Sequence, residues 1–438
     1  MSVDVCGAVS LAAWITLALL ARRPAVPLAA YFMVMATAWS ALALAMRAQR
    51  YAAVGRLRVI GWAAAFRVVG LCSAPVLDDD TARYLWDGHV FATRGTPYGI
   101  APLSAFARDH GAAPGGRVLD AINHPELPTI YGPLCQWVFR ASHAVAPAHL
   151  LPLKLVLLAA ELAGVLLLAP RLGAWVLALA WCPLAVHEVA FNAHLEPLAM
   201  TPMLFAMLFV MPSATPCPTP TPIAAVRGDV LAGAAMGASL AARPFALLIA
   251  PFILRTRWRG WAVAGAVLAA FYSPLLWRGS AEGVSWGAFA SGWEFDSSLF
   301  ALASGALGPV GARIACAGLL AAVVVTLLRR SRSDVLPPGD ALYGAAFALG
   351  PVLEPWYALW LLPFAALRPS RAAWTALAAV SLSYAYGLHL PSGAGYEHPV
   401  WVRLLEFGLV ALALALDLAK GRPKWGAAAG GQDVSTCE

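Results

Sequence analysis

The sequence predicts an all-α fold: a polytopic membrane protein of about 12–14 transmembrane helices with one long extracytoplasmic loop that contains short helices. Three observations lead to this fold class. The chain is 61% hydrophobic and only 12% charged, about half the charged fraction of soluble proteins. Apolar segments of membrane length recur from end to end, and the short loops between them are rich in arginine. We therefore treat residues 1–438 as a single integral membrane domain.

The apolar segments account for most of the chain. Several are short, and those near 228–254 and 340–367 are interpreted as half-helices or broken spans, so the expected number of spans is a range. The segments are 3–21, 26–46, 57–74, 149–169, 172–188, 195–212, 228–242, 245–254, 260–276, 310–328, 340–353, 357–367, 372–388 and 400–417.

The positions of the cations predict the orientation. If the N-terminus is cytoplasmic and the spans alternate, more than half of the 30 Lys and Arg residues fall in one set of loops. Short cytoplasmic loops carry such an excess, so both termini are expected in the cytoplasm. The proline- and threonine-rich stretch 212–227 is then a cytoplasmic linker. Because the basic residues are explained in this way, we expect contacts with membrane lipids and no nucleic-acid partner.

Ionisable residues gather on the opposite face. His187, Glu188, His194 and Glu196 lie within ten residues between two apolar segments. An aromatic belt and solvated loops explain many Trp and Tyr residues there, but charged groups at membrane depth are costly and indicate function. The seven cysteines are scattered without a CxxC pair, so we interpret them as small core residues.

The long loop 75–148 contains the strongest cluster of negative charge. Its stretches 79–93 and 134–146 are helix-like, and prolines separate them. In the first stretch Arg83 can pair with Asp79 or Asp87, four residues away on either side. One arginine cannot pair with the three adjacent carboxylates of residues 78–80. Cation binding by oxygen ligands, general-base catalysis and ion translocation remain open as their role.

A second charged feature interrupts an apolar run at Arg243-Pro244. An arginine at a helix break suits a phosphate, because its guanidinium presents a fork of donors. The alternative is a cation at the end of a span whose side chain reaches the membrane surface. A buried anion site that faces a carboxylate base is what transfer of a group from a phosphate requires.

Six motifs in the same order resemble those of the GT-C superfamily of membrane glycosyltransferases, most closely its polyprenyl-phosphate-hexose-dependent branch, which includes bacterial alpha-mannosyltransferases. The resemblance covers about residues 55–410. Glu196 stands where the family pattern has Asp, and Arg243 where it often has Lys. The motifs are DDxxxRYLWDGxV…GxPY (79–98), INHPELPTIYGP (122–133), WCPLAVHEVAFNAHLEPLAM (181–200), ARPFALLIAP (242–251), WEFDSSLF (293–300) and EPWYALWLLPF (354–364).

The resemblance implies transfer of a hexose, mannose as first choice, from a polyprenyl-phosphate donor to a lipid or glycan acceptor on the extracytoplasmic face, with inversion. Asp79 is the expected general base and Asp80 its close rival. The donor phosphate would leave toward Arg243, or toward Arg403 as a second choice. Asp78 and Asp87 are interpreted as structural, although Asp87 stays among the substrate-binding candidates. The other candidates are Arg83, His124, Tyr131, His194, Glu196, Trp356 and Tyr357.

The resemblance implies neither a cofactor nor a metal, because a single phosphate carries less charge to neutralise than a diphosphate. The competing class is a transporter or flippase of a lipid-linked or polar substrate, which broken helices and intramembrane charges would fit. The absence of a detectable internal repeat and the long aspartate-bearing loop fit that class less well. A scaffold without chemistry would not need the clustered ionisable groups.

Overall fold

The computed structural model describes residues 2–50, 54–108, 121–210, 222–276, 287, 291–331, 336–385 and 399–420. Throughout these ranges the regular structure is helical, and the β-pairing within them is an isolated parallel bridge between Phe295 and Val352. The expected all-α fold is confirmed for these residues.

The helices follow the apolar segments closely. Five of the described helices, α1, α2, α8, α14 and α16, are long and apolar enough to cross a membrane. The number of spans and their sidedness stay predictions. The longer helices are α1 (Val3–Leu20), α2 (Leu28–Ala48), α3 (Arg56–Leu71), α8 (Leu151–Leu172), α11 (Glu196–Val210), α12 (Pro222–Ala242), α13 (Ala246–Leu254), α14 (Trp258–Leu276), α16 (Leu299–Arg330), α17 (Gly339–Leu349), α19 (Arg371–Ala379) and α20 (Val400–Lys420).

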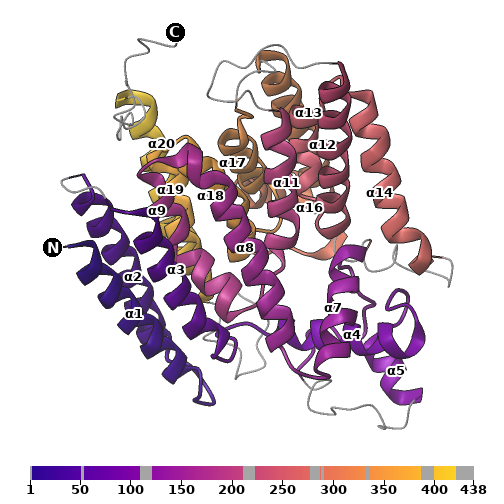
Figure 1. Ribbon diagram of the computed structural model, residues 1–438, viewed down its shortest axis with the longest axis horizontal. Coiled ribbons are helices and arrows are strands. Elements are labelled where there is room, and N and C mark those ends of the chain that lie inside the picture. The colour runs from indigo at the N-terminus through magenta and orange to yellow at the C-terminus, as the bar shows by residue number, and fades with distance from the viewer. Residues whose placement is uncertain are drawn as a thin grey trace.

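The loop 75–148 contains α4 (Asp80–Arg94), α5 (Pro102–Arg108) and α7 (Pro133–Val145). The first and last of these cover the two stretches that were expected to be helical. Figure 1 shows the three helices as a small lobe at one end of the helical bundle. Residues 212–221 of the expected linker lie outside the described residues, and residues 222–227 form the beginning of α12.

The segment that leads from α3 into this lobe is held by two buried polar side chains. Lys154 of α8 is 2% exposed, and its ammonium donates to the carbonyl oxygens of Gly70 (3.0 Å) and Ser73 (2.8 Å). These bonds hold the carbonyls at and just beyond the end of α3; that of Gly70 also accepts the Ser73 N–H. The Oδ1 of Asn192 accepts the backbone N–H of Val76 at 2.8 Å. The start of the lobe is therefore fixed against the bundle.

Three interruptions of regular helix occur next to the lobe. The π-helix η1 (Val186–Phe191) follows α9 (Trp175–Ala180) and α10 (Pro183–Ala185), and the 3₁₀-helix η2 (Pro355–Leu361) precedes α18 (Leu362–Leu367). The third lies between α12 and α13, at Arg243-Pro244, where the sequence predicted a break. Single-turn π-helices and other interruptions are frequent at functional sites because they release backbone groups and redirect side chains.

Close packing of α3 against η1 depends on a glycine. A Cβ atom at Gly70 would lie 2.6 Å from the Cβ of Ala190 and 2.8 Å from its carbonyl carbon, whereas a Cβ at Gly61 of the same helix meets nothing within 4 Å. Gly61→Ala should therefore stabilise the protein by about 0.5–1 kcal/mol through helix propensity. Gly70→Ala should destabilise it by about 1–3 kcal/mol through overpacking.

Thermal unfolding of the purified variants measures this difference. Equal midpoints for the two variants would contradict the close contact between α3 and η1.

Candidate functional site

A cavity of about 330 Å³ opens where the lobe meets the bundle. Its walls come from the α3–α4 loop, α4, the segment before α7, the break after α12, the loop before α16 and the start of η2. It is lined by Asp78, Asp79, Asp80, Arg83, Asn123, His124, Leu127, Pro128, Ile130, Tyr131, Arg243, Gly292, Trp293, Phe295, Glu354, Trp356 and Tyr357.

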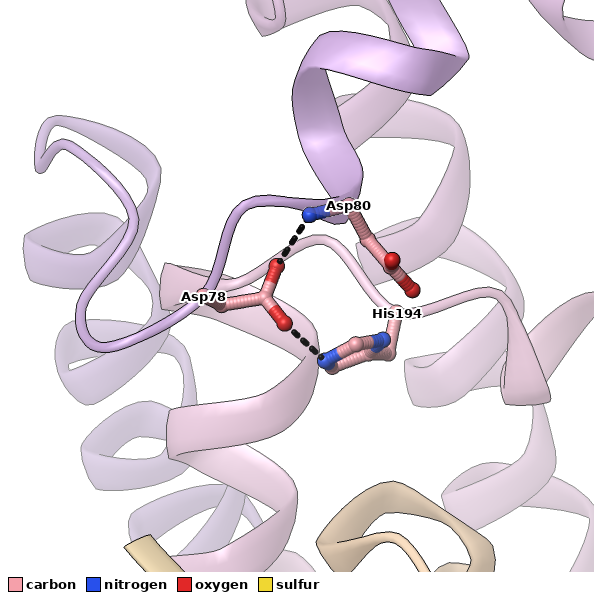
Figure 2. A group of neighbouring side chains, drawn as sticks. All are labelled: Asp78, Asp80 and His194. Carbon is pink, nitrogen blue, oxygen red and sulfur yellow. Dashed lines mark hydrogen bonds and ion pairs between the residues drawn. The ribbon is translucent and has the colours of Figure 1, made fainter. Parts of the chain in front are cut away.

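Three consecutive carboxylates form one wall. The Oδ1 of Asp78 accepts the backbone N–H of Asp80 at 3.2 Å, which turns the chain into α4. Its Oδ2 lies 3.2 Å from the Nε2 of His194. Figure 2 shows the Asp78 and Asp80 carboxyl groups and the His194 ring around one shared gap. Ligand atoms of these three residues lie within 4.8 Å of one another, so they could hold a metal ion.

The surroundings of these aspartates raise their pKa values. Burial, followed by the charge of Glu188, raises the pKa of Asp78 to about 8. Burial and the charges of Asp80 and Asp78 raise the pKa of Asp79 to about 7. Burial and the charge of Asp78 also raise the pKa of Asp80. Asp79 is the most open of the three, so it combines access to the cavity with a pKa near neutrality.

Arg243 faces the carboxylates from the break between α12 and α13. Its Nε lies 3.2 Å from the Oε1 of Glu196, a fully buried carboxylate at the start of α11. Its guanidinium carbon lies 5.5 Å from the ring centre of Tyr131. The Arg243 Nη2 is buried and has no hydrogen-bond partner among the described residues. The Arg243 Nε likewise has no hydrogen-bond partner among the described residues, so the Glu196 carboxylate holds the guanidinium by charge while part of its donor fork remains available to a ligand.

A buried polar network supports the carboxylates. The ring of His194 stacks on that of Trp356, with ring centres 3.7 Å apart. The Nε2 of His194 also lies 3.4 Å from the Oε2 of Glu188. Glu188 in turn contacts the Nδ1 of His187 at 2.8 Å and accepts the hydroxyl of Tyr384 at 2.9 Å. The histidine and glutamate cluster found in the sequence therefore lies directly behind the aspartates.

A second network holds the opposite wall. The Nε of Arg83 lies 3.1 Å from the Oδ1 of Asp87, one turn along α4. This settles the choice between Asp79 and Asp87 as its partner. Gln136 donates to the Oδ2 of Asp87 (2.9 Å) and to the hydroxyl of Thr129 (2.9 Å). The 121–132 segment is fastened to the lobe by these bonds.

Two loops far apart in sequence complete the rim. The bridge between Phe295 and Val352 joins them, with the N–H of Leu353 donating to the Phe295 carbonyl at 2.9 Å. This pairing places Trp293 and Glu354 on the cavity wall. The ring of His124 meets that of Trp293 edge-on, with centres 4.7 Å apart.

The structure brings most of the sequence-predicted residues together. Asp87, His194 and Glu196 lie behind the lining, each in contact with a lining residue. Arg403, on α20, does not line the cavity, and its charge acts on Asp296 instead. The predicted residues that line the cavity are Asp79, Asp80, Arg83, His124, Tyr131, Arg243, Trp356 and Tyr357.

Other lining residues were not predicted as site residues. Asp78 was assigned a structural role, yet it lines the cavity and contacts His194. Glu354 lies between Leu353 and Pro355 in an otherwise apolar stretch, a signal that could have found it. Asn123 and Trp293 lie within the recognised motifs 122–133 and 293–300, but they were not singled out as site residues.

The combined arrangement can perform two tasks. Carboxylates with raised pKa values can accept a proton from a hydroxyl group, and the free part of the arginine fork can receive an anion. Aromatic walls suit the apolar faces of a sugar ring. No protein-family model, curated protein or solved structure matches this chain.

Proposed function

We propose that this chain is an integral membrane glycosyltransferase that moves a hexose, mannose as first choice, from a polyprenyl-phosphate donor to a hydroxyl of a lipid or glycan acceptor. The observation that supports this most directly is the cavity in which an accessible aspartate and a partly free arginine face a common space. An acceptor hydroxyl needs a base, and a leaving phosphate needs a cation.

The distribution of apolar surface supports the membrane location. The helices α16 and α20 expose many large aliphatic side chains, among them Leu302, Val310 and Ile314 on α16 and Leu404 and Leu418 on α20. Soluble proteins rarely expose such extended apolar faces. The cavity lies beside the lobe, at one end of the bundle. In our proposal that end faces the extracytoplasmic side, and the arginine-rich loops face the cytoplasm.

Asp79 is the general base in this proposal. It is more exposed than Asp80, whose Oδ2 accepts a hydrogen bond from the Tyr84 hydroxyl at 3.4 Å. Asp79 takes the proton of the acceptor hydroxyl as the acceptor oxygen bonds to the anomeric carbon. The bond from that carbon to the phosphate oxygen breaks, and the phosphate keeps the electron pair. A single displacement of this kind inverts the anomeric centre.

Arg243 receives the phosphate. Its ion pair with Glu196 holds the guanidinium at the cavity wall, and the buried Nη2 is available to a phosphate oxygen. Trp356 and Tyr357, at the start of η2, supply aromatic faces beside the sugar. Arg83 lines the cavity and can contact the substrate directly, and Asp87 holds Arg83 in place.

Replacing the proposed base tests the reaction. Asp79→Asn keeps the size of the side chain and removes the basic oxygen, so transfer of mannose from polyprenyl-phosphate-mannose to a membrane lipid extract should fall by about 10²–10⁴-fold. Asp4→Asn is the matched control: Asp4 is a half-exposed carboxylate on α1 that pairs with Arg58, outside the cavity. It should keep full activity.

Asp80→Asn is made in parallel, because Asp80 is the competing base. Full activity of both cavity variants would rule out an aspartate base at this site. Movement of the lipid-linked substrate across vesicle membranes without a glycosidic product would indicate the transporter class instead.

The role of Arg243 is tested with its charge partner. Arg243→Lys keeps the positive charge but loses the fork, and we expect transfer to fall by about 10²-fold, the cost of removing one donor to developing charge. Arg243→Gln alone would leave the Glu196 carboxylate buried without a partner. The double variant Arg243→Gln with Glu196→Gln avoids this and should fold while transfer falls further.

Initial rates and thermal unfolding of each variant are measured together. Normal transfer by the folded double variant would remove Arg243 from the mechanism.

A further inference from the structure

We infer that Asp78, Asp80 and His194 bind one divalent cation of the Mg²⁺ or Mn²⁺ class at the inner end of the cavity. The sequence-based expectation was that no metal takes part. The cation site itself rests on the geometry and charge of these residues. Its role toward a donor phosphate rests on the proposed function.

The spacing of the three residues suits a single ion. Their ligand atoms all lie within 4.8 Å of one another. Metal–ligand distances of about 2.0–2.3 Å place two ligands on opposite sides of one ion about 4.0–4.6 Å apart. Figure 2 shows the two carboxyl groups, from the loop after α3 and from the first turn of α4, facing the His194 ring across one gap. Small side-chain movements would bring all three to ligand distance.

His194 supplies an independent reason for a ligand. The residue is completely buried, and its Nε2 has no hydrogen-bond partner among the residues that the structure describes. The Oδ2 of Asp78 and the Oε2 of Glu188 approach this nitrogen at 3.2 and 3.4 Å, but without the geometry of a hydrogen bond. Buried polar atoms are almost always satisfied. A metal ion bound at Nε2 satisfies the nitrogen and its neighbouring carboxylate together.

The charge of the cavity leads to the same conclusion. Four carboxylates line it, those of residues 78–80 and Glu354. The two lining arginines each pair with a carboxylate behind the wall, Arg83 with Asp87 and Arg243 with Glu196. None of these four carboxylates forms an ion pair with a lysine or arginine among the described residues. A divalent cation can bind to such unpaired carboxylates and offer a coordination position to the phosphate that Arg243 also receives.

The chemistry of the ligands selects the class of ion. Two carboxylates, one imidazole and cavity water favour a hard or intermediate cation, since oxygen ligands suit Mg²⁺ and Mn²⁺. Asp79 is absent from the ligand set and stays available as the base. The three consecutive aspartates then have distinct tasks: the two outer residues bind the ion, and the middle one faces the acceptor.

Mn²⁺ alone is the probe. The full chain, purified and stripped with EDTA, is titrated with Mn²⁺, and the free ion is measured by electron paramagnetic resonance. We expect one bound ion per wild-type chain. Loss of an outer partner of a metal ligand costs about 10–100-fold in affinity, so loss of a direct ligand in Asp80→Asn or His194→Gln should cost at least about 100-fold.

Two controls separate loss of the site from loss of folding. Asp4→Asn should bind Mn²⁺ as the wild type does, because Asp4 lies outside the cavity. Asp79→Asn removes a neighbouring charge but no ligand, so it should still bind one ion per chain, with a smaller loss of affinity than Asp80→Asn. Asp80→Glu keeps a carboxylate and should recover part of the affinity lost in Asp80→Asn. Each variant is checked for an unfolding transition without metal.

The outcomes test the cation site and the proposed transferase activity independently. Absence of Mn²⁺ binding by the wild type at millimolar concentration overturns the site. Binding that Asp80→Asn and His194→Gln leave unchanged also overturns it. Transfer that survives EDTA but is lost in Asp79→Asn removes the cation's role and leaves the transferase standing. Stoichiometric binding that both ligand variants abolish, in a protein without transfer activity, supports the site and contradicts the proposed function.

Discussion

The concentration of negative charge after α3 is the constraint on which the rest of the site depends. Neighbouring carboxylates repel one another, and a free loop would let them separate. Here Lys154 and Asn192, both buried, hold the backbone of this loop at two points. The aspartates consequently stay together at the end of the bundle. Burial, and after it the charges of neighbouring carboxylates, raises the pKa of Asp78 to about 8 and that of Asp79 to about 7.

Ion pairs behind the cavity wall determine how much positive charge is left inside it. The two arginines that line the cavity form ion pairs with carboxylates behind it: Arg243 pairs with Glu196, and Arg83 pairs with Asp87. The Arg83–Asp87 pair gives a rigid wall, because Arg83 also donates to the Leu127 carbonyl and Asp87 also accepts from Gln136. The two ion pairs leave the interior short of positive charge. The free energy of binding of a cation, or of a ligand that carries one, is therefore more favourable here than at a neutral site.

The sequence predicted the helices well, because apolar runs and prolines mark where they begin and end. It also placed Arg243 at a helix break, since the proline comes directly after it. The sequence showed two clusters of ionisable residues, at 78–80 and at 187–196. In the structure His194 contacts both Asp78 and Glu188, so the two clusters meet. That proximity could not be read from hydropathy, because it depends on how α3 and η1 pack.

Two other features also required tertiary structure. The pairing of Phe295 with Val352 joins loops that are more than fifty residues apart. Neither loop has the alternation of apolar and polar residues that would predict a strand. The pairing brings Glu354 to the cavity. Arg403 resembles Arg243 in its charge and in its place in an apolar segment, but it does not line the cavity, and its charge acts on Asp296. Charge in an apolar segment indicates a site without identifying which site.

The π-helix η1 limits the insertions and deletions that this protein can accept during evolution. Within it the N–H of Asn192 bonds to the carbonyl of His187, five residues back. An ordinary helical turn would accommodate one residue fewer. Removing a single residue between Val186 and Phe191 would relax the turn and rotate His187 and Glu188 by about 100° relative to His194 and α11. The length of this segment is therefore fixed by the network to which His187 and Glu188 belong.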